Sequence, residues 1–261
     1  RMNSCAAGTS IHMNYGNADF EPGTASDTWG DYLGAWHFGE ASGTAYDSGK
    51  NGYHGTPKGA RAEYNVGVDG VIGRARTNGG NAANGEGDKV GMVLDDTSYL
   101  LLGERFTVSG FFYVKGRAGW YRLVSRRWSG SSDGWGTELN WDDDSMLYVY
   151  GGGGDSTLVR IPTLEKQWVY LTLAYDGKSC SVYANGQLVQ KAELKAAPTD
   201  NGHPIAFGNQ GDVAEWTLFG HYDEIRLSTG YPTEAEVAAD SLTMTDADLF
   251  SASAAQAAEP T

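Results

Sequence analysis

The residues of this chain with the clearest potential for chemistry are three polar side chains at period two. Glu138, Asn140 and Asp142 alternate with Leu139 and Trp141, so an extended strand would place all three on one face. Two carboxylates could serve as nucleophile and proton donor in glycoside hydrolysis, which in a retaining mechanism needs carboxyl groups about 5–5.5 Å apart. The Cα atoms of Glu138 and Asp142 would be about 13 Å apart on such a strand, and an amide such as Asn140 cannot hold a proton. We therefore predict no catalytic residues and no enzyme, with glycoside hydrolysis as the least favoured alternative and a plain solvent-facing strand as the simplest one.

Aromatic residues near loops give the same region a second possible chemistry. Aromatic rings stack on the apolar face of a sugar ring, while neighbouring polar side chains bind its hydroxyl groups. The alternative is that some of these rings are core residues, because a Trp in a β-rich segment is usually buried. The pair Arg126 and Arg127 would either add a cation to the aromatic surface or solvate a turn. The predicted ligand-binding residues are Trp120, Trp128, Trp135, Glu138, Asn140 and Tyr148.

These side chains would be positioned by a β-rich framework whose clearest part is the stretch from Trp168 to Val189. Apolar residues alternate with polar ones on both sides of Asp176-Gly177, and Asn185-Gly186 closes a second turn. Asp-Gly and Asn-Gly pairs between such runs are strong hairpin signals, so the stretch predicts a three-stranded meander. Further strands are expected at intervals of roughly 10–15 residues, a spacing typical of a two-sheet sandwich. Their ranges are 35–38, 60–64, 73–76, 90–92, 106–114, 120–126, 136–141, 145–150, 156–161, 204–208 and 216–227, with one helix at 234–239.

The meander and the last strand carry a family resemblance. The Tyr-Asp-Gly and Tyr-x-Asn-Gly turns, together with Asp223-Glu224-Ile225-Arg226, resemble laminin G-like domains of the concanavalin A-like lectin and glucanase superfamily. The resemblance implies an all-β, concanavalin A-like jelly-roll sandwich of two antiparallel sheets. Family 16 glucanases of this superfamily carry Glu-x-Asp-x-Glu at the position of Glu138, and this chain departs from that motif at two of its three positions.

The resemblance also implies a structural calcium ion. In many relatives the residue matching Asp223 binds Ca²⁺ with carbonyl groups of the first strand and the loop after it, and Asp47 and Asn51 lie in that loop. Oxygen ligands of this kind are what Ca²⁺ prefers. The predicted metal ligands are thus Asp47, Asn51 and Asp223. Asp47 could instead form an Asx-turn, and Asp223 could pair with Arg226 or another basic neighbour.

Domain boundaries follow from the same comparison. Residues 31–240 form the laminin G-like domain, and residues 241–261 are too poor in apolar side chains to fold alone. Residues 1–30 contain an isolated strand at 10–15 and a linker, and they resemble the end of a small β domain of bacterial surface proteins. Because a lone strand needs a partner for its backbone groups, residues 10–15 are expected to pair with the main sheet, a preceding domain or another subunit. We expect the chain to be a piece of a longer protein.

Net charge and composition exclude some classes of binding partner. The 261 residues include 33 Asp and Glu against 19 Lys and Arg, a formal charge of −14, which repels nucleic acid and anionic lipid. No apolar run is long enough to insert into a membrane. The predicted function is a non-catalytic binding or adhesion module of a secreted or cell-surface bacterial protein, whose partner is a glycan or an extracellular protein. The alternative is a structural subunit of an extracellular assembly. Cys5 and Cys180 match no metal or redox motif, and whether they form a disulfide stays open.

Overall fold

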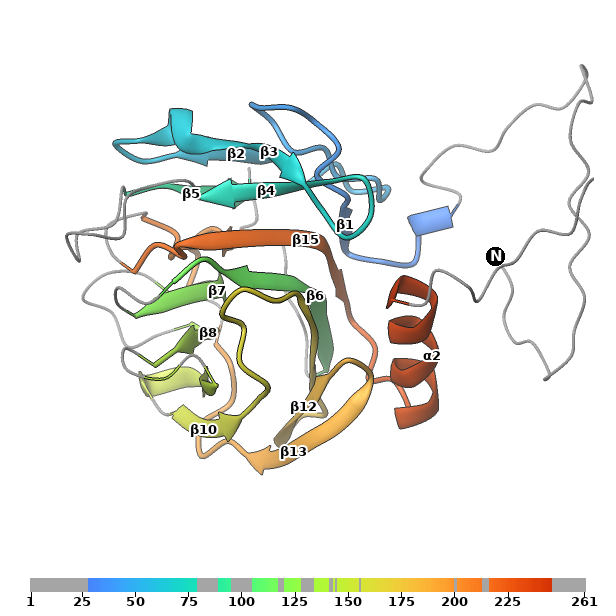
Figure 1. The fold of residues 1–261 in the computed structure, drawn as a ribbon. Coiled ribbons are helices and arrows are strands. Elements are labelled where there is room, and N and C mark those ends of the chain that lie inside the picture. Colours follow the sequence, from blue (N-terminus) through green and yellow to red (C-terminus); the bar gives the residue numbers. More distant parts are fainter. Residues whose placement is uncertain are drawn as a thin grey trace, which may run out of the picture.

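The computed structural model describes residues 28–78, 89–94, 105–116, 120–127, 134–140, 143, 145–154, 156–199, 201–212 and 216–245. Within them the chain forms two antiparallel sheets packed face to face, with a C-terminal helix against the outer side of one sheet (Figure 1). The predicted all-β jelly-roll sandwich is confirmed. The predicted strand at 10–15, Cys5, Trp128 and Asp142 lie outside the described residues.

The first sheet, sheet A, has the strand order β13-β12-β11-β6-β15-β4-β3, and β1 also pairs with β15. The longest strands, β6 and β15, lie side by side near its middle. The element bounds are β1 Gly34–Trp36, β3 Asn65–Asp69, β4 Arg74–Asn78, β6 Phe106–Val114, β11 Val169–Tyr175, β12 Ser179–Ala184, β13 Gln187–Glu193 and β15 Gly220–Ser228.

The second sheet, sheet B, has the order β10-β9-β8-β7-β14-β5-β2. Its strands are shorter, and four of them, β7, β8, β9 and β10, follow one another in the chain as a meander. The bounds are β2 Gly55–Lys58, β5 Gly91–Leu94, β7 Tyr121–Ser125, β8 Gly136–Leu139, β9 Met146–Tyr150, β10 Ser156–Arg160 and β14 Ala206–Phe207.

The predicted meander of sheet A forms as expected. Asp176 closes the first turn by accepting the Ser179 N–H on Oδ1 at 2.7 Å. At the second turn Asn185 and Gly186 have φ angles of 48° and 77°, a left-handed backbone that Asn and Gly tolerate best. The inward faces of these strands join those of sheet B in one hydrophobic core.

The predicted strand at 60–64 is wrong. Residues Ala62–Tyr64 form the single 3₁₀ turn η1, and the neighbouring strands β2 and β3 were not predicted. Gly59, with a φ angle of 111°, ends the extended backbone after Lys58, so the chain turns where continuous strand was expected. A second short 3₁₀ segment, η4, spans Gly152–Gly154.

The helix α2, Glu234–Thr245, covers part of the outer face of sheet A (Figure 1). It begins with a capping box, in which the Thr233 hydroxyl accepts the Glu236 N–H and the Glu236 carboxylate accepts the Thr233 N–H. Val237 packs against Ala174 and Tyr183. The predicted domain end at 240 falls inside this helix. No described helix combines the length and the apolar character needed to cross a membrane.

Candidate functional site

Strands β7, β8 and β9 hold a polar and aromatic cluster on the outer face of sheet B. Their inward residues, Tyr121, Leu123, Leu139, Leu147 and Val149, belong to the core. The alternation of a strand therefore directs the residues between them away from the core. We call the resulting group the sheet B cluster; it consists of Trp120, Arg122, Arg127, Glu138, Asn140, Tyr148, Tyr150 and Trp216.

A buried ion pair is the centre of the sheet B cluster. Arg122 and Glu138 are register partners on β7 and β8, and Arg122 Nη2 lies 2.6 Å from Glu138 Oε2. The two side chains are only 2% and 6% exposed. Burial raises the pKa of Glu138, and the neighbouring Arg122 opposes that rise; burial likewise lowers the pKa of Arg122. Burying an ion pair to this extent carries a large desolvation cost unless the remaining polar atoms of both side chains also form hydrogen bonds.

Several of those polar atoms lack a partner. Arg122 Nε and Nη1 and Arg127 Nη1 are buried, and none of the three forms a hydrogen bond within the described part of the chain. The cluster therefore holds more hydrogen-bond donors than its own described residues satisfy. Glu138 has a second hydrogen-bonding partner besides Arg122, since the Tyr150 hydroxyl donates to its Oε1 at 3.2 Å.

Aromatic rings surround the two arginines. The Arg122 guanidinium lies 4.6 Å from the centre of the Trp216 ring and 5.0 Å from that of Tyr150. Arg127 lies 4.1 Å from the Tyr150 ring. Cation–π contacts of this kind orient the guanidinium groups and offset part of their lost hydration.

Trp216 is held in an unusual backbone conformation. Its φ angle is 60°, in the left-handed region that bulky residues rarely adopt, and its side chain is 38% exposed. The Arg122 N–H donates to the Trp216 carbonyl oxygen at 3.0 Å, which ties the strained residue to β7. Backbone strain concentrates at functional sites, because the surrounding structure must hold it there.

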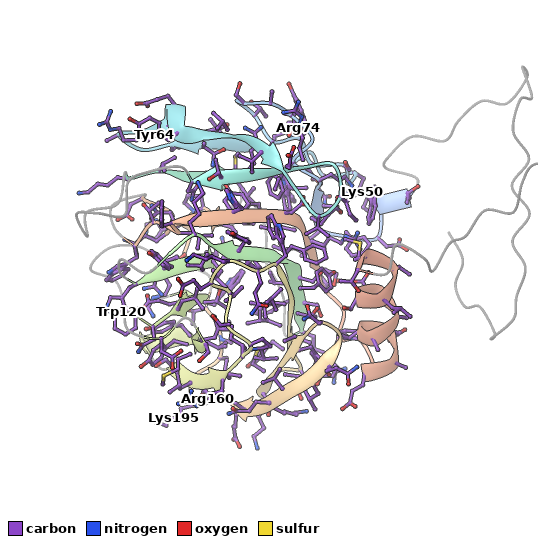
Figure 2. The ribbon with its side chains drawn as sticks, viewed as in Figure 1. Lys50, Tyr64, Arg74, Trp120, Arg160 and Lys195 are labelled. Carbon is purple, nitrogen blue, oxygen red and sulfur yellow. The ribbon has the colours of Figure 1, made fainter. Side chains whose placement is uncertain are left out.

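The edge of the cluster is formed by a second aromatic pair. The Trp120 and Tyr148 rings lie 5.6 Å apart, and Asn140 Nδ2 is 3.3 Å from the Tyr148 hydroxyl oxygen. Figure 2 shows Trp120 on the side of the molecule opposite α2. Trp120, Tyr148 and Asn140 are each half-buried, so their polar atoms and ring edges reach solvent.

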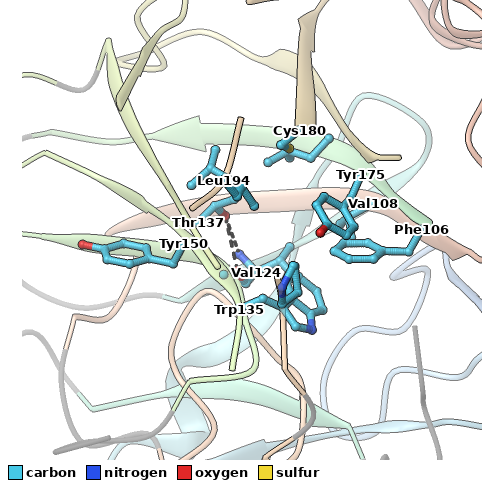
Figure 3. A pocket seen from close by; sticks show the side chains of 13 residues that line it. Phe106, Val108, Val124, Trp135, Thr137, Tyr150, Tyr175, Cys180 and Leu194 are labelled. Carbon is cyan, nitrogen blue, oxygen red and sulfur yellow. Dashed lines mark hydrogen bonds between the residues drawn. The ribbon is translucent and has the colours of Figure 1, made fainter. Parts of the chain in front are cut away.

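The structure brings together four of the predicted ligand-binding residues and separates a fifth from them. Trp120, Glu138, Asn140 and Tyr148 all belong to the sheet B cluster. Trp135 instead points into the space between the sheets, where it lines an apolar cavity of about 20 Å³ with Phe106, Tyr175 and Cys180 (Figure 3). The Cys180 thiol is free and fully buried, and burial raises its pKa to about 12.

Sequence reasoning missed Arg122, Tyr150 and Trp216. The signal for Arg122 was its place in Tyr121-Arg122-Leu123, where a charged residue alternates with core residues. Tyr150 stands two residues after Tyr148 and so shares its face. Of the arginine pair, Arg127 joins the cluster, whereas Arg126 is buried and donates from Nε to the His203 carbonyl oxygen at 2.9 Å.

The predicted metal ligand Asp47 has backbone donors around it. Its Oδ1 accepts the N–H groups of Ala35 and Gly49 at 2.9 and 2.7 Å, and its Oδ2 accepts that of Tyr53 at 3.0 Å. The bond to Gly49 is the contact of an Asx-turn. Asn51 is exposed and donates to the Leu33 carbonyl oxygen.

Asp223 is similarly provided with donors. It is fully buried at a β-bulge, and its carboxylate accepts the N–H groups of Val71, Ile72 and Glu224. Burial raises its pKa to about 7, against the lowering effect of these hydrogen bonds. Within the described residues no group of three His, Cys, Asp or Glu side chains is placed to hold a metal ion. Both aspartates accept backbone N–H groups, and a calcium ion, which binds oxygen ligands, stays a prediction at these positions.

Comparison with known proteins identifies the family. A family model described as the concanavalin A-like lectin/glucanases superfamily matches residues 84–238, more than half of the 261 residues. The chain belongs to this superfamily. No curated protein sequence matches the chain.

Solved structures of this superfamily's fold include several binding domains. Domain 4 of AbnA, an extracellular GH43 arabinanase from Geobacillus stearothermophilus, in complex with arabinotriose, has a TM-score of 0.58 at 22% identity, covering 80% of this chain and 97% of that domain. The binding domain of Paraclostridial mosquitocidal protein 1 has a TM-score of 0.58 at 17% identity, covering 84% of this chain. The binding domain of botulinum neurotoxin DC in complex with SialylT also reaches 0.58, at 10% identity and 82% of this chain. The chain spans 53% and 51% of the lengths of these two toxin domains, and identities this low show the fold alone.

Proposed function

We propose that this concanavalin A-like chain is a non-catalytic binding module whose sheet B cluster binds a glycan. The observation that carries the proposal is the buried Arg122–Glu138 ion pair, in which N–H groups of Arg122 have no hydrogen-bond acceptor among the described residues. Partly exposed aromatic rings surround this pair. Glycan sites combine ring stacking with a few oriented hydrogen-bond donors and acceptors. Arg122 and Arg127 supply donors, Glu138 and Asn140 supply acceptors, and Trp120, Tyr148 and Trp216 supply apolar ring surface.

The same geometry argues against hydrolysis. Glu138 is bonded to Arg122 and Tyr150, so its carboxylate is neither free to attack nor protonated by a neighbouring acid. A retaining mechanism needs a second carboxyl group about 5–5.5 Å away. No second carboxylate forms a hydrogen bond or ion pair with any member of the cluster in the described ranges, and Asp142 lies outside them.

Relatives of this fold support a glycan partner by analogy only, since one fold serves many functions. The arabinanase domain is in complex with arabinotriose and the neurotoxin domain with SialylT. By analogy with the same two domains we also propose that the chain acts outside the cell. The alternative ligand is a protein. A calcium ion beside Asp223 remains a prediction, and the hydrogen bonds around that residue explain its burial without a metal.

The test is a glycan-array screen of the purified chain, with and without Ca²⁺, followed by titration of the best ligand. Tyr148→Ala should weaken binding about two- to tenfold, because ring stacking contributes about 0.5–1.5 kcal/mol. The matched control is Tyr46→Ala, which removes a tyrosine that is 58% exposed and outside the cluster. Equal affinity of wild type and Tyr148→Ala for every ligand found would refute the site.

A further inference from the structure

A second group of rings lies on the outer face of sheet A, where α2 does not reach. The helix contacts Ala174 through Val237 and the Tyr170 hydroxyl through Asp240. From Ala174 to Tyr170 these contacts run toward the start of β11. The next outward side chain in that direction is Trp168, which immediately precedes the strand. Trp168 therefore stands beyond the part of the sheet that the helix covers.

Trp168 forms a compact three-ring cluster with Tyr113 and His221. Tyr113 and His221 are register partners on β6 and β15, with ring centres 5.2 Å apart. Trp168 lies 5.5 Å from Tyr113 and 5.9 Å from His221. All three side chains are half-buried, so part of each ring faces solvent.

The cluster has one cation beside it. Lys115 Nζ donates to Thr77 Oγ1 at 3.1 Å and lies 5.6 Å from the centre of the Phe219 ring. Within the described residues it forms no ion pair, and burial lowers its pKa with no carboxylate opposing the shift. In a chain of net charge −14, a half-buried ammonium group without a carboxylate partner is unusual.

His221 does not share that charge. Burial, with a smaller effect from Lys115, lowers the pKa of His221 to about 4, so its ring is neutral at neutral pH. Its Nδ1 is buried and has no hydrogen-bond partner among the residues that the structure describes. The surface thus consists of three uncharged rings with a single positive charge at one side, which is complementary to an apolar ring face that carries an anionic group.

We propose that Tyr113, Trp168, His221 and Lys115 form a second sugar-binding surface, separate from the sheet B cluster, for a sugar residue that carries a carboxylate. The pyranose ring of a hexuronate would stack on Trp168 and Tyr113, and its carboxylate would pair with Lys115. Two surfaces on opposite sheets would allow one chain to contact two glycan segments and gain avidity.

The experiment is an equilibrium titration with trigalacturonate and, as the neutral counterpart, galactotriose, followed by Trp fluorescence and by calorimetry in EDTA. The variants are Trp168→Ala and Lys115→Met, each checked for native circular dichroism and melting temperature. The control is Lys178→Met, which removes a lysine with a 72% exposed side chain, and Tyr148→Ala reports separately on the sheet B cluster. If Trp168→Ala fails to fold, Trp168→Phe and Lys115→Met carry the test.

We expect trigalacturonate to bind wild type more tightly than galactotriose does, and to bind Trp168→Ala and Lys115→Met about five- to tenfold more weakly. Binding to Lys178→Met should be unchanged. The proposal is overturned if trigalacturonate does not bind, if Lys115→Met binds it as wild type does, or if Tyr148→Ala alone abolishes binding. Because the sheet B cluster is tested by Tyr148→Ala, either surface can fail while the other stands.

Discussion

Each sheet of this sandwich carries a buried arginine on its outer face, and the two arginines are treated differently. On sheet A, Arg226 pairs through Nη1 with Asp240 at 2.9 Å and through Nη2 with Glu224 at 3.3 Å. The Trp29 ring lies 4.6 Å away, and α2 supplies Asp240. On sheet B, Arg122 pairs with one carboxylate, that of Glu138, and in the described ranges its Nε and Nη1 have no hydrogen-bond partner, whereas on Arg226 this is true of Nε alone. Arg226 is therefore more fully enclosed by its own chain, and Arg122 is the arginine that the proposed glycan site uses.

The surroundings of Arg226 explain why its face is closed. Glu224 also bonds His37 Nδ1 at 2.8 Å, and Asp240 accepts the Tyr170 hydroxyl, so one network joins the residue after β1 with β11, β15 and α2. Desolvation is the main cause of the raised pKa of Tyr170, with Asp240 adding to it. Such a network stabilises a unique packing only when its members are satisfied, and here most of them are.

The largest effect should come from breaking this network. We expect Arg226→Met to lower the free energy of unfolding by about 3–5 kcal/mol, because Glu224 and Asp240 lose their shared cation. Denaturant unfolding measures the change. The control is Arg160→Met, which removes an arginine whose side chain is 73% exposed and should change stability by less than about 1 kcal/mol. A loss for Arg226→Met no larger than that control would show that the two faces do not differ as argued.

A pH test examines another buried polar group of sheet A. The folded-state pKa of Asp223 is about 7 and its ordinary value is 3.8, so its protonated form is the one the fold favours. In EDTA, the stability of wild type relative to Asp223→Asn should be greatest below about pH 4, fall as pH rises to about 7, and stay level above it. Saturating Ca²⁺ should abolish this slope if the ion binds there. A flat difference in EDTA would mean that the three N–H groups offset the effect of burial and hold the folded-state pKa of Asp223 at its ordinary value.

Sequence patterns predicted the sandwich and part of the cluster because both depend on local alternation. The turns at Asp176-Gly177 and Asn185-Gly186 fix the meander, and Glu138 shares a face with Asn140 by period two alone. The local sequence patterns could not predict which distant segments pair with one another. Trp216 reaches Arg122 from 94 positions away, and no local pattern indicates that contact. The bulge at Asp223 likewise depends on the alignment of β15 with β6.

Arg122→Met should cost less stability than Arg226→Met but should abolish glycan binding. Burial has already raised the pKa of Glu138, so that carboxyl can become protonated when its cation is removed, and a loss of about 1–3 kcal/mol is expected. Denaturant unfolding and titration of the best array ligand measure the two effects on one preparation. Retained binding in a folded Arg122→Met variant would remove the functional contrast between the arginines.

The smallest effect should come from Glu138→Gln, which keeps the shape of the side chain and a hydrogen bond to Tyr150. Losing the charge weakens the ion pair with Arg122 and also removes the desolvation cost of a buried carboxylate, so a change of about 1 kcal/mol in unfolding free energy is expected. Neither wild type nor Glu138→Gln should hydrolyse laminarin, agarose, carrageenan or mixed-linkage glucan, because Glu138 is bonded to Arg122 and interacts with no second carboxyl group among the described residues. Glycan binding should be nearly the same in both, since Arg122, Arg127 and the rings remain. Release of reducing sugar by wild type, lost in Glu138→Gln, would instead assign the sheet B cluster to catalysis.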